Sequence, residues 1–432
     1  MAKVAIVHRD EVPGLPSKYT DKELKVVTDM VDEMFNLLGG IDKIIKPGET
    51  VVLKPNACTY FGSVMKDKKT GEEKINLQAA ANTDARVLAA ITKLALEKAK
   101  AKEVITGETC AFDYHERWQA KITLDVSGIK NAVEAVGGKA LDFNDAERVE
   151  IKMKQPSFAM DKINVPEILT RDDVAFINVP AMKTHTFETV TLGFKNYQGI
   201  FKWEDKLIAH DGKLSLKFVD IAKALPPRLT VITGIWAVQG QGPIPMRGHD
   251  YMTIQDMNTI IAGDNIVATD AVCANVMGID PMNVRTIRMG AAAGIGPLDL
   301  KDIEVVGTPL EKVKRDFIKS SGEPEGIYPN TRILAGSACY VCKALARAML
   351  DGIAFTLKVF KDDPVIFILG KNNKIPSDIE GSDKDVWVIG DCAEEWKDVT
   401  SNVHFFPGCC PMQANIELPG TIIGKWKALR AK

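Results

Sequence analysis

The sequence predicts an α/β protein with mostly parallel sheets flanked by helices. Short apolar runs alternate with segments of helical periodicity over about the first 310 residues. That alternation is typical of parallel strands joined by crossover helices. The chain has 432 residues, which is too long for one compact core, so we expect several domains. With 46% hydrophobic and 26% charged residues, the composition is that of a soluble globular protein.

The first predicted domain is an N-terminal α/β lobe over residues 1–148. The hydrophobic spacing of Asp21–Leu38 predicts a helix that ends at Gly39-Gly40. Thr83 or Asp84 is the expected cap of a second helix, which reaches about Lys100. The stretch Lys66–Lys74 predicts a solvated, charged loop. The other expected elements are the strands Lys3–Val7, Val51–Leu53, Glu103–Glu108 and Ala140–Phe143, and the helix Ser127–Val136.

The second predicted domain is another α/β lobe, over residues 149–320. The apolar run Val174–Val179 predicts a buried strand within it. Val190, Phe194 and Tyr197 then follow the spacing i, i+4, i+7, so we expect a helix from Thr186. The other expected elements are the strands Glu150–Pro156, Thr230–Val238, Thr259–Ala262 and Ile303–Val306, and the helices Leu216–Ala224, Ala268–Met277 and Asn283–Ala293.

The third predicted domain, residues 321–432, is a small α/β unit rich in cysteine. Gly322–Pro329 reads as a linker into it, and Val341–Leu350 predicts a helix. The expected strands are Val365–Leu369, Val386–Ile389 and Val403–Phe406. The domain contains five of the eight cysteines of the chain: Cys339, Cys342, Cys392, Cys409 and Cys410.

These five cysteines predict a metal centre. Cys339 and Cys342 form a C-x-x-C at the start of a helix, where the helix dipole favours thiolates. Cys392 ends a strand, and Cys409-Cys410 follows the turn at Pro407-Gly408. Four such thiolates suit either zinc or a [4Fe–4S] cluster, and the apolar neighbours favour the shielded cluster. The alternative is a redox C-x-x-C beside inert buried cysteines.

A second candidate site follows the strand Val174–Val179. Lys183, His185, Lys195 and Asn196 lie in a segment that is otherwise apolar, and Lys54 and Asn56 end another buried strand. Ligands of open α/β sheets bind at strand ends, and desolvation shifts Lys or His towards acid–base or nucleophilic use. We therefore predict Lys195, His185 and Lys54 as catalytic, and Lys183, Asn196 and Asn56 as cofactor-binding. The alternative is a solvated helix face with ordinary lysines.

Composition also excludes some partners. The chain has 55 Lys and Arg against 57 Asp and Glu, a formal net charge of −2, whereas nucleic-acid binding requires a basic surface. No apolar stretch reaches the length of a membrane span, and Met1–His8 has a strand pattern rather than that of a signal peptide. We expect a cytoplasmic protein without a membrane or nucleic-acid partner, with a homodimer as one expected assembly.

The sequence resembles the domain of unknown function 362 family, whose members are also labelled uncharacterised iron–sulfur centre proteins. The matching segments are Val51–Asn56, Asn178–Pro180 with Lys183–His185, Leu192–Asn196 with Gly199, Val267–Ala271 with Asp264, Met277–Gly278 with Asp280-Pro281, Gly390–Ala393 and Gly408-Cys409. The family is distantly similar to nickel-pincer lactate racemases. That similarity implies a two-lobed α/β fold with a site between the lobes, and a His and a cofactor-bearing Lys ten residues apart, as His185 and Lys195 are.

Three functional hypotheses follow. The leading one is an iron–sulfur oxidoreductase that binds a small anionic substrate in an interlobe cleft and receives electrons from a protein such as a ferredoxin. The second is a racemase or isomerase with an additional cofactor at Lys195. The third is a non-catalytic binding protein stabilised by zinc.

Overall fold

The computed structural model describes residues 1–14, 19–57, 64–66, 73–75, 80–110, 119–209, 212–240, 242, 253–353, 357, 360, 364–409, 411, 420–425 and 427–428. The chain divides into two compact units. Unit 1 comprises Met1–Ile208, Ser215–Ile244 and Met252–Lys319, and the main part of unit 2 is Ser320–Lys432, with two short segments, Ala209–Leu214 and Pro245–Tyr251. The division between Lys319 and Ser320 lies one residue from the predicted boundary between the second and third domains.

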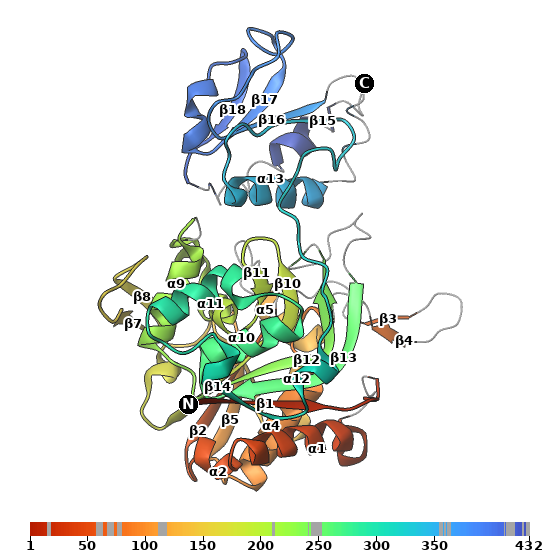
Figure 1. Cartoon of the computed structure of the whole chain (residues 1–432), viewed down its shortest axis with the longest axis vertical. Helices are drawn as coiled ribbons and strands as arrows, with labels where there is room; N and C mark the ends of the chain where they lie inside the picture. Colours follow the sequence, from red (N-terminus) through yellow and green to blue (C-terminus); the bar gives the residue numbers. More distant parts are fainter. Residues whose placement is uncertain are drawn as a thin grey trace. The chain divides into compact units, whose positions relative to one another are not determined.

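A ten-stranded sheet forms the centre of unit 1 (Figure 1). Its parallel strands include β9, whose neighbours are β2 on one side and β12 on the other. The antiparallel pairings are those of β13 with β1 and β12, and of β11 with β10. The sheet is thus mostly parallel, and the predicted α/β class is confirmed. In spatial order its strands are β14 (Ile303–Gly307), β1 (Ala2–His8), β13 (Thr253–Gly263), β12 (Leu229–Gln239), β9 (Val174–Val179), β2 (Thr50–Pro55), β5 (Glu103–Glu108) and β6 (Lys139–Asp142), with β10 (Ala181–His185) beside β12 and β11 (Thr189–Thr191) beside β10.

This sheet corrects the prediction of two separate lobes. Strands from residues 1–148 and from residues 149–320 pair directly, since Val51 of β2 lies opposite Ala175 of β9. Unit 1 also combines both predicted lobes in one compact body. The alternation of strands and helices predicts that strands form, but the order in which they pair depends on contacts between distant residues. The interlobe cleft is replaced by the carboxyl edge of a single sheet.

Helices cover both faces of the sheet, as Figure 1 shows. One face packs against α1 (Asp21–Leu37), α4 (Ala85–Glu97) and α6 (Ile129–Ala135), with Val31, Leu88 and Val133 in their shared core. Asp84 caps α4 by accepting a hydrogen bond from the backbone N–H of Arg86, as predicted. On the opposite side, α10 (Ile266–Val276) packs against β13 and β1, with α11 (Arg285–Ala292) beside it.

The remaining elements of unit 1 are short. In the described part of the chain, no helix is long and apolar enough to cross a membrane. The ends of the predicted loop Lys66–Lys74 belong to a hairpin of β3 and β4, and residues 67–72 between them lie outside the described residues. The short elements are α2 (Ile41–Ile44), β3 (Val64–Lys66), β4 (Glu73–Ile75), α5 (Gln119–Val126), β7 (Arg148–Lys152) paired with β8 (Lys162–Pro166), α7 (Gly193–Asn196), α8 (Trp203–Leu207), α9 (Leu214–Ala224) and α12 (Leu310–Val313), with 3-10 turns at Glu167–Thr170, Tyr197–Ile200, Pro281–Asn283 and Leu300–Asp302.

The helix predicted from Thr186 is wrong. β10 and β11 form an antiparallel hairpin there, in which His185 lies opposite Thr189. Thr189 has a φ of 67°, which a helix does not allow, and β-branched residues such as Val190 and Thr191 favour a strand. The helix begins only at Gly193 and is four residues long.

Unit 2 contains a four-stranded, fully parallel sheet. Three of its strands match the predicted positions, whereas β15 was not predicted. Helix α13 (Tyr340–Ile353) follows β15. The core on one face includes Ile366, Val388 and Ile379. In spatial order the strands are β15 (Thr331–Leu334), β16 (Val365–Leu369), β17 (Asp385–Ile389) and β18 (Asn402–Phe406), and a 3-10 turn spans Asp391–Trp396.

Candidate functional site

The first candidate site lies at the carboxyl edge of the parallel strands of unit 1. Lys54, near the end of β2, and Glu108, at the end of β5, form an ion pair with 2.7 Å between Nζ and Oε2. Their side chains are 0% and 2% exposed. Backbone N–H groups of Ala57 and Thr109 also donate to the Glu108 carboxylate, at 3.1 and 2.9 Å. Lys54 is therefore not the uncompensated cation that the predicted anion pocket requires.

Asn196 connects this ion pair to the next strand. Its Nδ2 donates to the carbonyl oxygen of Lys54 at 2.9 Å and to Oδ1 of Asn178 at 2.7 Å. The structure thus brings two predicted site residues, Lys54 and Asn196, into direct contact. Asn196 is the last residue of α7, and the position of this helix is fixed at its start, where the N–H of Gly193 donates to the Asp270 carboxylate at 2.8 Å. Burial raises the pKa of Asp270 to about 7.

The other two residues predicted to bind a cofactor make backbone contacts. Lys183 is fully buried, and its Nζ donates to the carbonyl oxygen of Ala81 at 2.6 Å. The backbone N–H of Asn56 donates to Oγ1 of Thr83 at 2.7 Å. Lys183 therefore contributes to holding the segment before α4 against β10, a structural contact that the sequence pattern did not predict.

Glu188 contacts His185 through its backbone N–H, and its carboxylate interacts electrostatically with Lys195. The backbone N–H groups of Phe187 and Glu188 donate to Nδ1 of His185, at 3.0 and 3.2 Å. Nδ1 is therefore an acceptor, and the ring proton lies on Nε2. The buried Glu188 carboxylate accepts a hydrogen bond of 2.7 Å from Ser215. Burial raises the pKa of Glu188 to about 7, although the charge of Lys195 opposes that rise.

Two buried lysines near this segment were missed by sequence reasoning. Lys217 lies with its Nζ 4.5 Å from the centre of the Phe201 ring and donates to the carbonyl oxygen of Asp205 at 2.6 Å. Burial lowers the pKa of Lys217 to about 7. Lys206, also buried, donates to the carbonyl oxygen of Cys110. No local pattern in the sequence identifies these two lysines, because the groups that they contact belong to other segments of the chain.

Several buried polar atoms at the carboxyl edge have no hydrogen-bond partner among the residues that the structure describes. They include Oδ1 of Asn56, Oγ1 of Thr109 and Oε1 of Gln198. All three belong to residues beside the Lys54–Glu108 pair. Asn56 lies two residues after Lys54, and Thr109 follows Glu108. Gln198 precedes Gly199, whose carbonyl oxygen accepts a hydrogen bond of 3.0 Å from the N–H of Thr109. Because buried polar groups are nearly always satisfied, we expect water or a ligand to supply partners at this edge.

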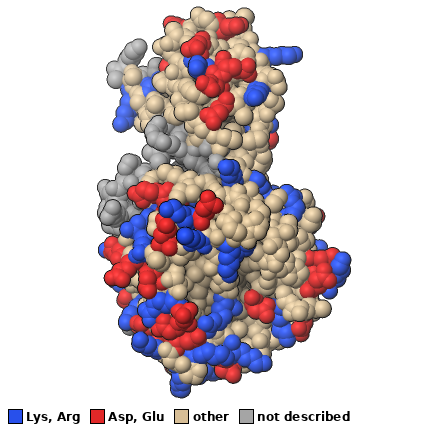
Figure 2. Space-filling view, turned by 90° about the vertical axis from the view of Figure 1, so that its left-hand side faces the viewer, with Lys and Arg blue, Asp and Glu red and all other residues tan. Residues whose placement is uncertain are grey.

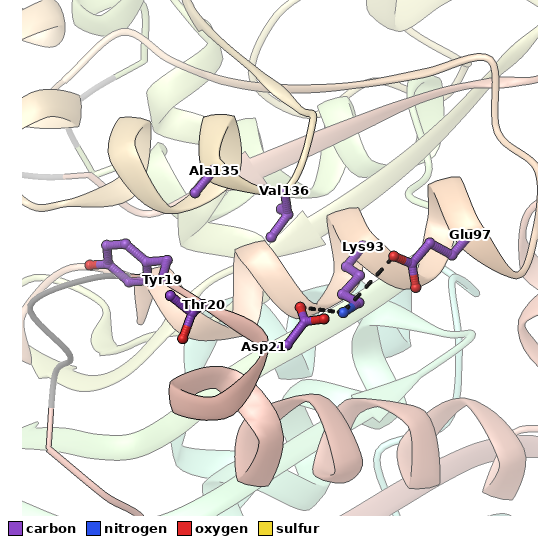
Figure 3. A pocket seen from close by; sticks show the side chains of 7 residues that line it. All are labelled: Tyr19, Thr20, Asp21, Lys93, Glu97, Ala135 and Val136. Carbon is purple, nitrogen blue, oxygen red and sulfur yellow. Dashed lines mark hydrogen bonds and ion pairs between the residues drawn. The ribbon is translucent and has the colours of Figure 1, made fainter.

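A surface pocket lies elsewhere on unit 1 (Figure 3). Lys93 lies in it between Asp21 and Glu97, and its Nζ is 3.9 Å from the Glu97 carboxylate. The pocket contains none of the predicted site residues. On the face that Figure 2 shows, acidic and basic side chains are interspersed, in keeping with the net charge of −2. The seven residues that line the pocket are Tyr19, Thr20, Asp21, Lys93, Glu97, Ala135 and Val136.

The second candidate site is formed by the cysteines of unit 2, at the carboxyl edge of its sheet. Cys339 and Cys342 lie at the start of α13, which begins at Tyr340, as predicted. Cys392 follows the end of β17 and Cys409 follows the end of β18. Cys410 lies outside the described residues. Parallel strands thus bring the described cysteines to the same edge, where ligands of α/β sheets bind.

The thiol of Cys342 interacts electrostatically with three other cysteines of unit 2. Burial is the main reason why the pKa of Cys342 is raised to about 12, and the next causes are three neighbouring thiols. They belong to Cys339, Cys409 and Cys392. A Cβ placed on Gly390 would lie 3.6 Å from Sγ of Cys342, so the turn after β17 packs closely against it. Cys342 is buried, whereas the other three are exposed.

The spacing of these thiols bears on which metal they fit. Within the described ranges, no group of three or more His, Cys, Asp or Glu side chains is arranged so that it could hold one metal ion. Four sulfur atoms around a single zinc, with Zn–S bonds of about 2.3 Å, lie about 3.8 Å apart. A four-iron cluster is larger and holds its thiolates further apart. The distance between the sulfur atoms therefore distinguishes a zinc site from a cluster site.

Comparison with known proteins gives two similar proteins. A thylakoid-associated protein of Synechocystis sp. is 27% identical over 266 residues, which cover 60% of this chain and 73% of that protein. A crystal structure of a Thermotoga maritima protein from a structural genomics consortium is 10% identical, with a TM-score of 0.32. That alignment covers 65% of this chain and 61% of the other, less than two thirds of its length.

The sequence profile described as Domain of unknown function (DUF362) matches residues 51–275. The matched region includes β2, β5, β9 and α7, which together build the carboxyl edge of unit 1. Because the match covers more than half of the 432 residues, the chain belongs to the DUF362 family.

Proposed function

We propose that this chain is an iron–sulfur protein whose cysteines in unit 2 hold one [4Fe–4S] cluster. The observation that supports the proposal is that Cys339 and Cys342 at the start of α13, Cys392 after β17 and Cys409 after β18 lie at one edge of the unit 2 sheet. Thiolate sulfur is the ligand that these clusters use. Three exposed cysteines leave such a centre near the surface, where an electron-transfer protein such as a ferredoxin can reach it. The proposed ligands are Cys339, Cys342, Cys392 and Cys409.

Anaerobic purification of the full chain tests this proposal. We expect bound iron and sulfide in equal amounts, and a broad visible absorption that dithionite bleaches. Cys342→Ala should lose the iron, whereas Cys273→Ala, which removes a buried thiol from α10 of unit 1, should retain it. A colourless protein that contains only zinc would instead support a zinc-stabilised binding protein. A wild-type chain without any metal would refute the cluster and leave Cys339 and Cys342 as a redox dithiol.

We further propose that the protein is an oxidoreductase and that Lys195 contacts a small anionic substrate. Lys195 is half-buried, with its Nζ 5.8 Å from the centre of the Phe218 ring. His185, whose ring proton lies on Nε2, accepts a hydrogen bond at Nδ1 from the backbone N–H of Glu188 in the same hairpin. The Glu188 carboxylate in turn interacts electrostatically with Lys195. Lys54 and Lys183 are assigned to holding this edge in place, because Lys54 pairs with the Glu108 carboxylate and Lys183 donates to the carbonyl oxygen of Ala81.

Thermal unfolding with small carboxylates and inorganic phosphate tests the anion site. A ligand that binds only the folded state raises the unfolding temperature by mass action. Lys195→Ala should abolish that rise, whereas Lys202→Ala, which removes a nearby half-buried lysine before α8, should preserve it. An unchanged rise in the Lys195→Ala variant, or no rise with any of these anions, would count against Lys195 as the substrate contact.

A further inference from the structure

Asp391 joins the two turns that carry Cys392 and Cys409. Its backbone N–H donates to the carbonyl oxygen of Gly408 at 3.1 Å. In return, the backbone N–H of Gly408 donates to Oδ1 of Asp391 at 2.5 Å. One residue thus makes a reciprocal pair of hydrogen bonds to the turn that ends in Cys409, while it is itself the immediate neighbour of Cys392.

The two turns depend on glycines at the points of contact. Gly390 has a φ of 88° and Gly408 a φ of 118°, both in the region that only glycine adopts readily. The N–H of Gly390 donates to the carbonyl oxygen of Phe406 at 2.9 Å, which extends the pairing of β17 with β18. Because both turns are tightly curved just after their strands, the β-sheet ladder stops before it reaches the cysteines. The Asp391 bonds continue the connection across that gap.

We propose that Asp391 is a positioning residue for the cysteine site, and this inference rests on the proposed function. By fastening the Cys392 turn to the Cys409 turn, Asp391 fixes the separation of the thiolates of these two cysteines. Residues that orient metal ligands through hydrogen bonds commonly change metal affinity about 10–100-fold when they are replaced. The carboxylate also places a negative charge beside the centre, which opposes the addition of an electron.

Three variants of the full chain separate these effects. Asp391→Ala removes the acceptor for the Gly408 N–H, whereas Asp391→Asn keeps an acceptor oxygen and removes the charge. Glu395→Ala is the matched control, because Glu395 is an exposed acid in the same 3-10 turn. Each chain is reconstituted anaerobically with ferrous iron and sulfide. Iron per chain, the rate of iron loss to a chelator and the midpoint potential are then measured.

For Asp391→Ala we expect about 10–100-fold faster iron loss than for the wild type. Asp391→Asn should lose iron to the chelator nearly as slowly as the wild type. Its midpoint potential should be higher, because the negative charge of Asp391 no longer repels the added electron. Glu395→Ala should lose iron at the wild-type rate. A purely structural defect that leaves the cluster intact does not change its midpoint potential. The midpoint potential therefore distinguishes a role of Asp391 beside the centre from a role in the stability of the fold alone.

Two results would overturn the inference while the proposed function stands. One is wild-type chelator resistance in Asp391→Ala, and the other is iron loss in Asp391→Asn as fast as in Asp391→Ala. If Asp391→Ala fails to fold, the Asp391→Asn result decides alone, since that side chain keeps the size and the acceptor. A wild-type chain that takes up no iron overturns both the proposed function and this inference.

Discussion

Replacing Glu108 with glutamine tests the energetic role of the buried ion pair. The Lys54 and Glu108 side chains are 0% and 2% exposed, and the carboxylate accepts from Lys54 and from two backbone N–H groups. Glutamine preserves the volume and one acceptor oxygen but leaves the Lys54 ammonium buried without a counter-charge. Removal of one partner from a buried pair destabilises proteins by about 3–5 kcal/mol. Against a typical stability of about 5–15 kcal/mol, this is a large loss.

Calorimetry of the wild type, the two single variants and the double variant measures this loss. At roughly 2–4 °C per kcal/mol, Glu108→Gln should lower the unfolding temperature of unit 1 by about 6–20 °C. Lys54→Met combined with Glu108→Gln should recover much of that decrease, because a neutral pair of similar volume avoids the cost of burying charge. A double variant as unstable as the sum of the single variants would refute the reasoning, since it would mean that the two groups act independently.

Three further predictions concern the same edge of unit 1. Gly199→Ala should destabilise the chain by about 1–3 kcal/mol in a urea titration, because a Cβ there would lie 1.8 Å from Oε1 of Glu108. Gly212→Ala is the control and should be neutral, because a Cβ on Gly212 would have no atom within 4 Å. The pKa of Asp270 is raised by burial to about 7, above its unfolded value of about 3.9. Its stabilising contribution is therefore complete below pH about 4 and is lost as the pH rises to about 7; Asp270→Asn should remove that slope, and an identical slope in the variant would contradict the assignment. The pKa of Lys217 is lowered by burial to about 7, so its contribution is complete above pH about 10.4 and is lost as the pH falls to about 7. Lys217→Met should flatten the unfolding free energy between those two limits, and a curve parallel to the wild type would rule out Lys217 as its source.

Local patterns in the sequence predicted local structure well. The strands Val174–Val179 and Glu103–Glu108 agree with the structure to the residue, because each is a short run with a sharp polar or turn boundary. The C-x-x-C of Cys339 and Cys342 was placed correctly at the start of a helix. In each case the information needed lies within about ten residues.

Features that depend on distant partners could not be predicted. Nothing in the sequence near Lys54 identifies Glu108 as its partner, because the two meet only when β2 and β5 pair in parallel. The spacing of Val190, Phe194 and Tyr197 suits a helix, yet pairing of β10 with β12 makes a hairpin more favourable there. Tertiary contacts override local periodicity in such segments.

The position of β1 has a consequence for how the chain folds as it is synthesised. β1 is made first, yet its two neighbours in the sheet, β13 and β14, are the last strands of unit 1 to leave the ribosome. Closure of the sheet is therefore a late, non-local event. A truncated protein limited to residues 51–275 would lack both β1 and β14, so that β13 would present unpaired N–H and C=O groups along its apolar residues Ile260 to Ala262. An edge of this kind recruits other chains, so the first strand protects the nascent sheet from aggregation as well as completing it.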